Sequence, residues 1–126
     1  MDRQVDDLQA RLSQLLHEAA EVSVALDCAN GTIQGVPHYS VIELRAHELG
    51  RQLSRQIQER YLQQMVAQQA VRGACPGCGT KCELKPVQRQ VTSIDGAVAA
   101  WELRGYCPRC RRAFFPPPGA AGLGRP

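Results

Sequence analysis

Two Cys-x-x-Cys motifs constrain this chain more than any other feature of its sequence. They are Cys75-Pro76-Gly77-Cys78 and Cys107-Pro108-Arg109-Cys110, and 28 residues separate them. Each motif turns tightly enough to place two thiolates on one metal ion, and two motifs complete a tetrahedral set. The four cysteines therefore predict a structural Zn²⁺ site in a zinc ribbon. A rubredoxin-like iron site uses the same thiolates, whereas a redox-active Cys-x-x-Cys usually lies in a βαβ context that is absent here.

The residues between the two motifs have the pattern of a β-hairpin. Strand-like runs extend over 83–93 and 97–106, and they meet at Ile94-Asp95-Gly96, where Asp-Gly favours a tight turn. In the second run, Ala97, Ala99, Trp101 and Leu103 fall on one face of the strand, with Glu102 and Arg104 on the other, which predicts a half-buried strand. Because so small a sheet buries little apolar area, we expect the metal to stabilise it directly.

The residues before Gly73 predict two helices, over about 3–27 and 40–72. The first has apolar residues at steps of four and three, a spacing that aligns them on one side of a helix: Leu8, Leu12, Leu15, Ala19, Val22 and Leu26. Asn30-Gly31 and Pro37 interrupt the pattern. Ser40 and Glu43 then have the spacing of a capping box. The second apolar stripe consists of Ile42, Ala46, Leu49, Leu53, Ile57, Tyr61 and Met65.

Both stripes are typical of core positions and need a helical partner. The two helices can pair with each other as an antiparallel hairpin, or with a second copy of the chain as a coiled coil, which would make a homodimer. The sequence favours neither arrangement. The predicted fold class is α+β, with a helical region over 1–72, a four-cysteine zinc ribbon over 73–116 and a Pro/Gly-rich tail over 117–126.

Charge divides the chain near the same place. Residues 1–72 carry seven basic and nine acidic side chains, a net −2, whereas residues 73–126 carry eight basic and three acidic ones, a net +5; together they give the +3 of the whole chain. An excess of positive charge on the ribbon is consistent with a nucleic-acid partner, although an ordinary solvated surface has the same count.

The remaining cysteines and the histidines have simpler interpretations. Cys82 is either a spare ligand or, as we favour, a partly buried thiol, because four ligands are already present. Cys28 is expected to be a small buried apolar residue. No cysteine or histidine lies at ligand spacing from His17, His38 or His47, so we expect these to be surface or capping residues.

Several classes of protein are excluded or disfavoured. No run approaches the roughly 18 uncharged apolar residues that a membrane span needs, and the acidic beginning of the chain is unlike a signal peptide. We therefore expect a cytoplasmic protein, in which the six cysteines are reduced. A chain of 126 residues without a phosphate-binding glycine loop, a serine nucleophile elbow or a His-Glu-x-x-His motif predicts no enzyme and no small-molecule substrate.

A more specific pattern runs through the second half of the chain. The two Cys-Pro-x-Cys motifs flank Arg89-Gln90-Val91-Thr92-Ser93-Ile94-Asp95-Gly96, and Phe114-Phe115-Pro116 follows the second motif. Together with Leu49-Gly50-Arg51 and Gly122-Leu123-Gly124, this arrangement resembles the N-terminal region of insertion-sequence transposases of the Kra group. Two features depart from that family: Pro117-Pro118 stands where a Leu-Asp-like pair is usual, and the DDE catalytic domain does not follow. The resemblance implies a DNA-end-binding or assembly module without strand-transfer chemistry.

Two principal hypotheses for the function follow. In the first, the ribbon binds DNA phosphates through basic residues, with little sequence selectivity from charge alone. The candidate contacts are Lys81, Lys85, Arg89, Arg104, Arg109, Arg111 and Arg112. In the alternative, the chain is a protein-interaction adaptor whose helical stripe contacts the partner, because zinc ribbons serve both roles. A third class, an electron-transfer iron protein, would be coloured on purification.

Overall fold

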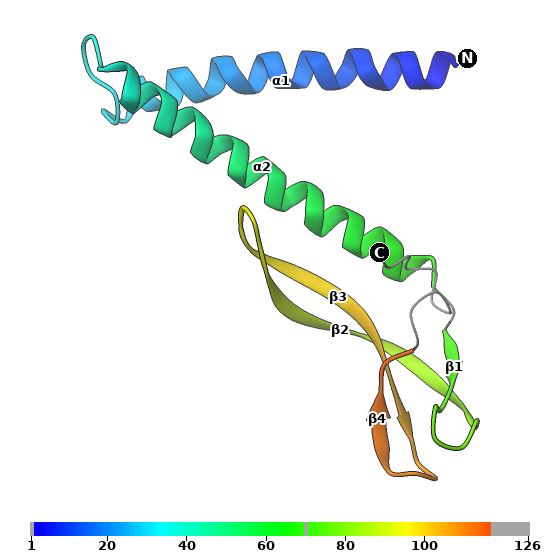
Figure 1. Cartoon of the computed structure of the whole chain (residues 1–126). Coiled ribbons are helices and arrows are strands. Elements are labelled where there is room, and N and C mark those ends of the chain that lie inside the picture. Colours follow the sequence, from blue (N-terminus) through cyan, green and yellow to red (C-terminus); the bar gives the residue numbers. More distant parts are fainter. Residues whose placement is uncertain (1, 70, 117–126) are drawn as a thin grey trace. The chain divides into compact units, whose positions relative to one another are not determined.

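The computed structural model describes residues 2–69 and 71–116; the Pro/Gly-rich segment over 117–126 lies outside them. Two long helices precede a four-stranded antiparallel sheet, which confirms the predicted α+β class (Figure 1). The elements are α1 (Arg3–Ala29), α2 (Tyr39–Ala67), β1 (Arg72–Ala74), β2 (Lys81–Ser93), β3 (Gly96–Cys107) and β4 (Arg112–Phe114). The chain forms two compact units, Met1–Ala46 and His47–Pro126.

In the first unit, an ion pair joins the end of α1 to the first turns of α2. Asp27 is 5% exposed, and Arg45 donates two hydrogen bonds to its carboxylate, Nε to Oδ2 at 3.2 Å and Nη2 to Oδ1 at 2.7 Å. The Asp27 carbonyl also accepts the N–H of Ile33 in the connecting loop, at 3.0 Å. Because Arg45 donates to the charged carboxylate, the pKa of Asp27 lies below its usual value.

The start of α2 differs from the predicted capping box. The helix begins at Tyr39, and the ring Nδ1 of His38 accepts the N–H of Ser40 at 3.2 Å and lies 2.9 Å from the Ser40 hydroxyl. The hydroxyl of Ser40 is thus engaged with a residue outside the helix rather than with the N–H of Glu43. His38 therefore has the capping role that the sequence assigned to Ser40.

The end of α2 also differs from the prediction. The helix stops at Ala67, whereas the sequence pattern extended it to Arg72. Arg72 instead begins β1 and pairs with Glu83 of β2. Pairing with β2 provides strand hydrogen bonds for residues that would otherwise form the last helical turn, and this explains the earlier end.

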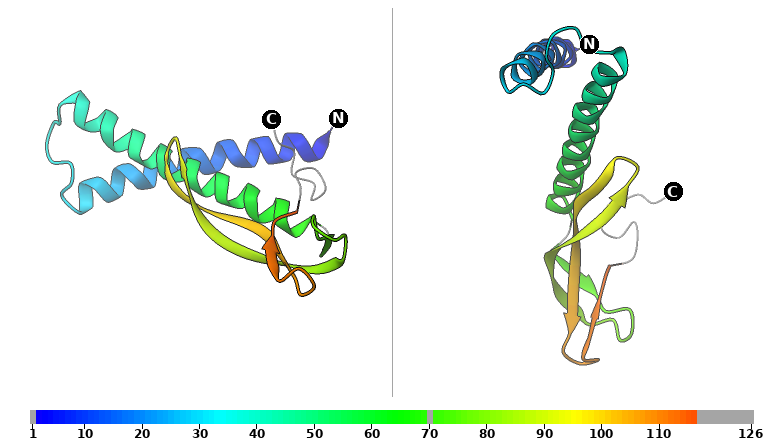
Figure 2. Two further views of the ribbon diagram at one scale, coloured as in Figure 1. Left: turned by 60° about the horizontal axis from the view of Figure 1, so that its bottom comes forward. Right: turned by 90° about the vertical axis from the view of Figure 1, so that its left-hand side faces the viewer.

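The sheet of the second unit has the strand order β1-β2-β3-β4, and every neighbouring pair is antiparallel (Figure 2). The central hairpin of β2 and β3 pairs without a bulge from Leu84 opposite Gly105 to Ser93 opposite Gly96. Its turn consists of Ile94 and Asp95, within the predicted Ile94-Asp95-Gly96. Gly96, the first residue of β3, has φ +113°, and the Ser93 hydroxyl donates to its carbonyl at 2.6 Å. The hairpin prediction is confirmed.

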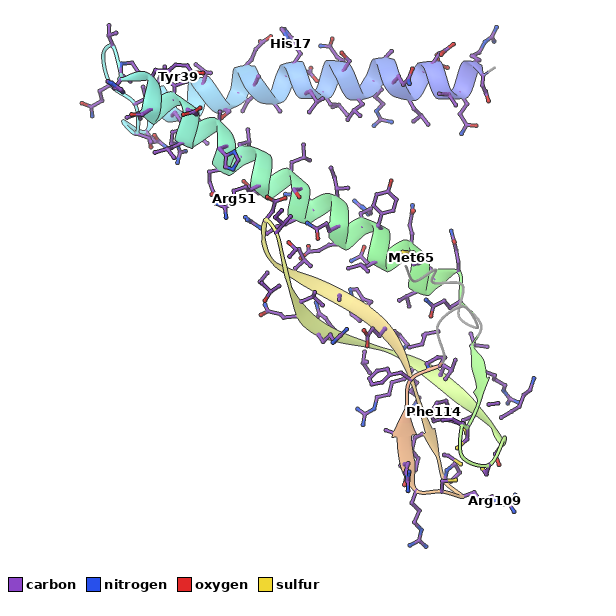
Figure 3. The ribbon with its side chains drawn as sticks, in the orientation of Figure 1. His17, Tyr39, Arg51, Met65, Arg109 and Phe114 are labelled. Atoms are coloured by element: carbon purple, nitrogen blue, oxygen red, sulfur yellow. The ribbon has the colours of Figure 1, made fainter. Side chains whose placement is uncertain are left out.

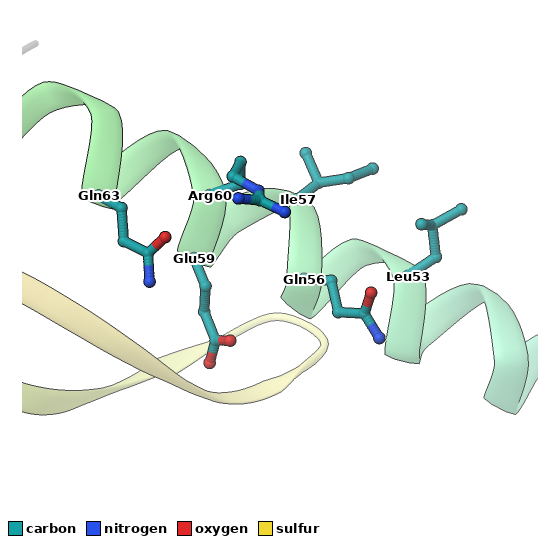
Figure 4. A pocket seen from close by; sticks show the side chains of 6 residues that line it. All are labelled: Leu53, Gln56, Ile57, Glu59, Arg60 and Gln63. Atoms are coloured by element: carbon teal, nitrogen blue, oxygen red, sulfur yellow. The ribbon is translucent and has the colours of Figure 1, made fainter. Parts of the chain in front are cut away.

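The part of α2 that belongs to the second unit contacts the turn end of this hairpin. Ser54 donates to the Asp95 carboxylate at 2.5 Å, and Arg55 donates to the Asp95 carbonyl at 2.9 Å. Glu59 accepts the backbone N–H of Ala99, at 2.8 Å, and points toward the hairpin (Figure 4). Because the outer edge of β3 has no neighbouring strand there, Glu59 satisfies an edge N–H that would otherwise lack a protein partner.

The buried face of β3 changes between the two ends of the hairpin. Near the turn, Val98 and Ala100 are buried, whereas near the cysteines Leu103, Gly105 and Cys107 are buried. The predicted face from Ala97 to Leu103 is therefore wrong at its beginning, because Ala97 is exposed and Ala99 is half-buried. Successive residues of a strand point to opposite faces, so the two ends of the hairpin bury opposite faces. The main cluster lies at the cysteine end: Cys75, Cys82, Leu84, Leu103, Cys107 and Phe114, with Val66 and Cys110 packed against it.

Candidate metal centre

The sulfur atoms of Cys75, Cys78, Cys107 and Cys110 converge at the end of the sheet. All four lie within 4.8 Å of one another, with 3.8 Å between Cys75 and Cys110 and 3.6 Å between Cys78 and Cys107 (Figure 3). A tetrahedral Zn²⁺ with Zn–S bonds of about 2.3 Å has S···S separations of about 3.8 Å. The four sulfurs thus fit a single tetrahedral metal ion, and the structure brings together the four ligands that the sequence predicted.

The two motifs have the same backbone construction. The residue after the second cysteine of each motif donates its N–H to the carbonyl of the first cysteine: Gly79 to Cys75 at 2.8 Å, and Arg111 to Cys107 at 2.7 Å. Both residues have positive φ, +79° at Gly79 and +57° at Arg111. Each turn therefore places its two cysteines through local hydrogen bonds, and β1, β4 and the hairpin bring the two turns together.

Neighbouring groups also hydrogen-bond to the sulfurs. The N–H of Gly77 donates to Cys75 Sγ at 3.3 Å, and the N–H of Cys110 donates to Cys107 Sγ at 3.4 Å. The hydroxyl of Thr80 lies 3.1 Å from Cys78 Sγ. Such outer contacts orient ligands and stabilise their negative charge. Thr80 was not singled out from the sequence, because a threonine two residues after a cysteine has no distinctive pattern.

These contacts shift the pKa values of Cys75, Cys78 and Cys110 in different directions. Hydrogen bonds from the Thr80 side chain and backbone lower the pKa of Cys78 to about 6, and the backbone N–H groups of Cys78 and Gly77 lower the pKa of Cys75. Side-chain hydrogen bonding with Cys78 and Cys75 raises the pKa of Cys110 to about 12. A metal ion must displace the remaining thiol protons, so metal binding releases protons to solvent.

The other two cysteines are not part of this group. Cys82 is 5% exposed and lies 3.4 Å from the Thr80 carbonyl, and its burial raises its pKa. This agrees with the interpretation of Cys82 as a buried thiol. Cys28 is exposed, which corrects the expectation that it is buried. The preceding residue, Asp27, points inward at the end of α1, where Arg45 binds its carboxylate. Cys28 is the next residue of the helix, so its side chain points in a different direction and is exposed.

The seven basic candidates for nucleic-acid contact are all exposed, but they have different surroundings. Arg109, Arg111 and Arg112 follow one another in and after the second motif, and within residues 71–116 no carboxylate pairs with them. Lys85 and Arg104 lie directly opposite each other on β2 and β3. Arg89 is 2.5 Å from the Glu102 carboxylate, so its charge is compensated. Lys81 begins β2 opposite Ala74.

A groove accompanies the Lys85–Arg104 pair. It has a volume of about 410 Å³ and is lined by Glu83, Lys85, Val87, Arg104, Gly105 and Tyr106. Tyr106 is exposed. Since Glu83 offsets one of the two positive charges, this groove is less basic than the arginines of the second motif. The sequence alone does not predict this groove, because the cross-strand register brings its lining residues together.

Comparison of the chain with protein-family models, curated proteins and solved structures finds no match. Among the residues that the structure describes, neither helix contains an apolar segment long enough to cross a membrane. The architecture is thus two helices followed by an antiparallel sheet with a four-cysteine cluster, without a family assignment.

Proposed function

We propose that this chain is a non-catalytic nucleic-acid-binding module whose ribbon is stabilised by Zn²⁺. The arginines of the second motif, Arg109, Arg111 and Arg112, bind phosphate groups. The observation that carries the proposal is the conformation of Arg111, a non-glycine residue with φ +57° at the position where the first motif has Gly79.

A left-handed backbone is unfavourable for a residue with a Cβ atom, by roughly 1–2 kcal/mol. Glycine removes this cost, as at Gly79, so the local fold alone favours glycine at position 111. The presence of an exposed arginine where glycine would fit without this cost supports a role for its side chain outside the fold. The guanidinium group is well suited to phosphate, because its planar donors bind two oxygens at once.

The surroundings of the three arginines support the same partner. Arg109 and Arg111 lie on the turn that the metal ligands Cys107 and Cys110 fix, and Arg112 begins β4, so their backbone positions are set before binding. The resemblance to the N-terminal region of Kra-group transposases also implies DNA as the partner. In that interpretation, the ribbon contributes affinity for the duplex, and the chemistry belongs to a catalytic domain.

The proposal is tested with zinc-loaded protein and a random-sequence DNA duplex at several salt concentrations. Replacing Arg109, Arg111 and Arg112 with Gln should weaken binding and flatten the slope of log K against log[salt] by about 0.9 per lost phosphate contact. Arg89→Gln is the control, because Glu102 already compensates that arginine. Equal affinity of the triple variant and the parent across the salt range would refute the proposal and favour a protein-interaction adaptor. Zinc content by elemental analysis separates this module from an iron protein.

A further inference from the structure

Helix α1 exposes a regular apolar stripe. The large side chains of the stripe are 49–65% exposed: Leu8, Leu12, Leu15, Val22 and Leu26. They recur with Ala19 at alternating steps of four and three, and Val5 continues the pattern toward the N-terminus. This heptad spacing is typical of a seam that packs against another helix.

The chain's own second helix is a poor match for the whole stripe. An antiparallel pairing that sets Leu26 against Ile42 also sets Ala19 against Leu49 and Leu15 against Leu53. The same register then sets Leu12, Leu8 and Val5 against Gln56, Arg60 and Gln63, respectively. These three polar residues of α2 line a shallow hollow together with Leu53, Ile57 and Glu59 (Figure 4). Pairing with α2 would leave the first half of the stripe against polar side chains.

A second copy of α1 in antiparallel orientation matches the stripe along its length. One register sets Val5 against Val22, Leu8 against Ala19 and Leu12 against Leu15, and the two-fold axis repeats each contact. Each of these contacts then joins two apolar side chains. Such an interface is isologous, as in most symmetric dimers.

The charges that flank the stripe support this register. Arg11 and Glu18 occupy the same heptad position, one residue before Leu12 and Ala19, and the antiparallel register sets Arg11 of each copy beside Glu18 of the other. In a parallel pair, Arg11 would instead flank Leu16, and Glu18 would flank Ser23. Neither Arg11 nor Glu18 has a salt-bridge partner within residues 2–69. The charge pattern is therefore complementary only in the antiparallel pair.

We propose that the chain forms a symmetric dimer in which α1 packs antiparallel against α1 of a second copy, with Arg11 beside Glu18 of the second copy. This inference does not depend on nucleic-acid binding. It concerns only the apolar stripe and its flanking charges.

Sedimentation equilibrium of the full-length, zinc-loaded chain at low salt provides the test. The wild-type protein should be a dimer. Arg11→Glu alone and Glu18→Arg alone each place like charges together twice, and each should raise the dimer dissociation constant about tenfold or more. The double variant should recover to within about threefold of wild type. Glu21→Arg is the matched control, because Glu21 pairs with His17 of its own helix, at 2.7 Å, and should leave dimerisation unchanged.

Mixing the two single variants sharpens the test. A heterodimer of Arg11→Glu with Glu18→Arg contains two opposite-charge contacts, so the mixture should form 1:1 dimers more tightly than either variant alone. Circular dichroism should show that all the variants remain helical. A monomeric wild-type protein would overturn the proposal and indicate that α2 covers the stripe. A dimer that neither the double variant nor the mixture restores would overturn the antiparallel register.

Discussion

Arg111 occupies in the second cysteine motif the position that Gly79 occupies in the first. Both residues have positive φ, and both donate an N–H to the carbonyl of the cysteine four positions earlier. The two turns differ in that only one of these positions has a side chain. This difference allows the cost of the backbone conformation to be separated from the benefit of the side chain.

Replacing Arg111 with Gly should leave the ribbon equally stable or stabilise it by up to about 1 kcal/mol, because glycine adopts this conformation without steric cost. DNA affinity should fall, since a guanidinium group is lost. Thermal unfolding and DNA titration of the zinc-loaded protein measure the two effects. Gly79→Ala is the reciprocal control: a Cβ there meets no atom within 4 Å, so the expected loss of about 1 kcal/mol reflects conformation alone. A clear loss of stability in Arg111→Gly would contradict the strain argument.

Gly105 of β3 lies so close to the Phe114 ring that there is no room for a larger side chain at this position. A Cβ at position 105 would lie 2.5 Å from Phe114 Cζ and 2.9 Å from Leu84 Cδ2, closer than packed carbon atoms approach. Gly105→Ala should therefore destabilise the ribbon by about 1–3 kcal/mol, measured by denaturant unfolding with zinc present. Gly50→Ala offers a matched comparison, because a Cβ there meets nothing within 4 Å and alanine favours the helix by up to about 1 kcal/mol. If Gly105→Ala were as stable as the wild-type protein, β3 would have to shift away from Phe114 and Leu84 to accommodate the added methyl group.

Metal removal should unfold the cysteine end of the second unit. The buried cluster at this end includes the ligands Cys75 and Cys107, and Cys110 packs against it. A chelator should therefore disorder β1, β4 and both motifs while helical circular dichroism persists. Cys110→Ser should have the same effect and lower the metal content below one ion per chain.

Cys28→Ser and Cys82→Ala are the controls for this experiment. Both should retain one metal ion per chain, because neither sulfur belongs to the four-cysteine group. Loss of metal in Cys82→Ala would mean that Cys82 is a ligand after all.

Acid should loosen the first unit through Asp27. The pKa of Asp27 is below its usual value of about 3.9 because Arg45 binds the carboxylate, so this contact stabilises the fold fully above pH 4. The stabilisation should decline as the pH falls from about 4 through the lowered pKa. Amide exchange of Ile33, whose N–H bonds to the Asp27 carbonyl, gives a local measurement. In Asp27→Asn, protection of Ile33 should be weaker at neutral pH and should not decline further over this acid range.

The features that the sequence predicted best depend on residues close together in the chain. Cys75 and Cys78 are three positions apart, the hairpin turns locally at Ile94-Asp95 before Gly96, and the apolar stripe of α1 is a repeating pattern. Each can be inferred from spacing and backbone preference alone. The meeting of the two motifs then follows from the hairpin between them, so the metal ligands were predictable as a set.

The features that the sequence did not predict depend on longer-range or competing contacts. Asp27 and Arg45 are 18 positions apart and lie in different helices. No repeating pattern in the sequence predicts that an acidic residue at the end of one helix pairs with a basic residue in the next helix. Ser40 has a suitable capping sequence, yet His38 engages it. On β3, strict alternation predicted one buried face, but Ala100 and Leu103 are both buried, because different partners cover the hairpin at its two ends.

The change of buried face on β3 has a consequence for optical measurements. It occurs at Trp101, the single tryptophan of the chain, which is half-buried and lies opposite Gln88. The alternation of the strand puts Trp101 on the same face as Leu103 and Cys107, and on the opposite face from Val98 and Ala100. The indole is therefore a native fluorophore on the cysteine-cluster face, and its emission spectrum should respond to disruption of that cluster more than to release of α2 from the hairpin turn.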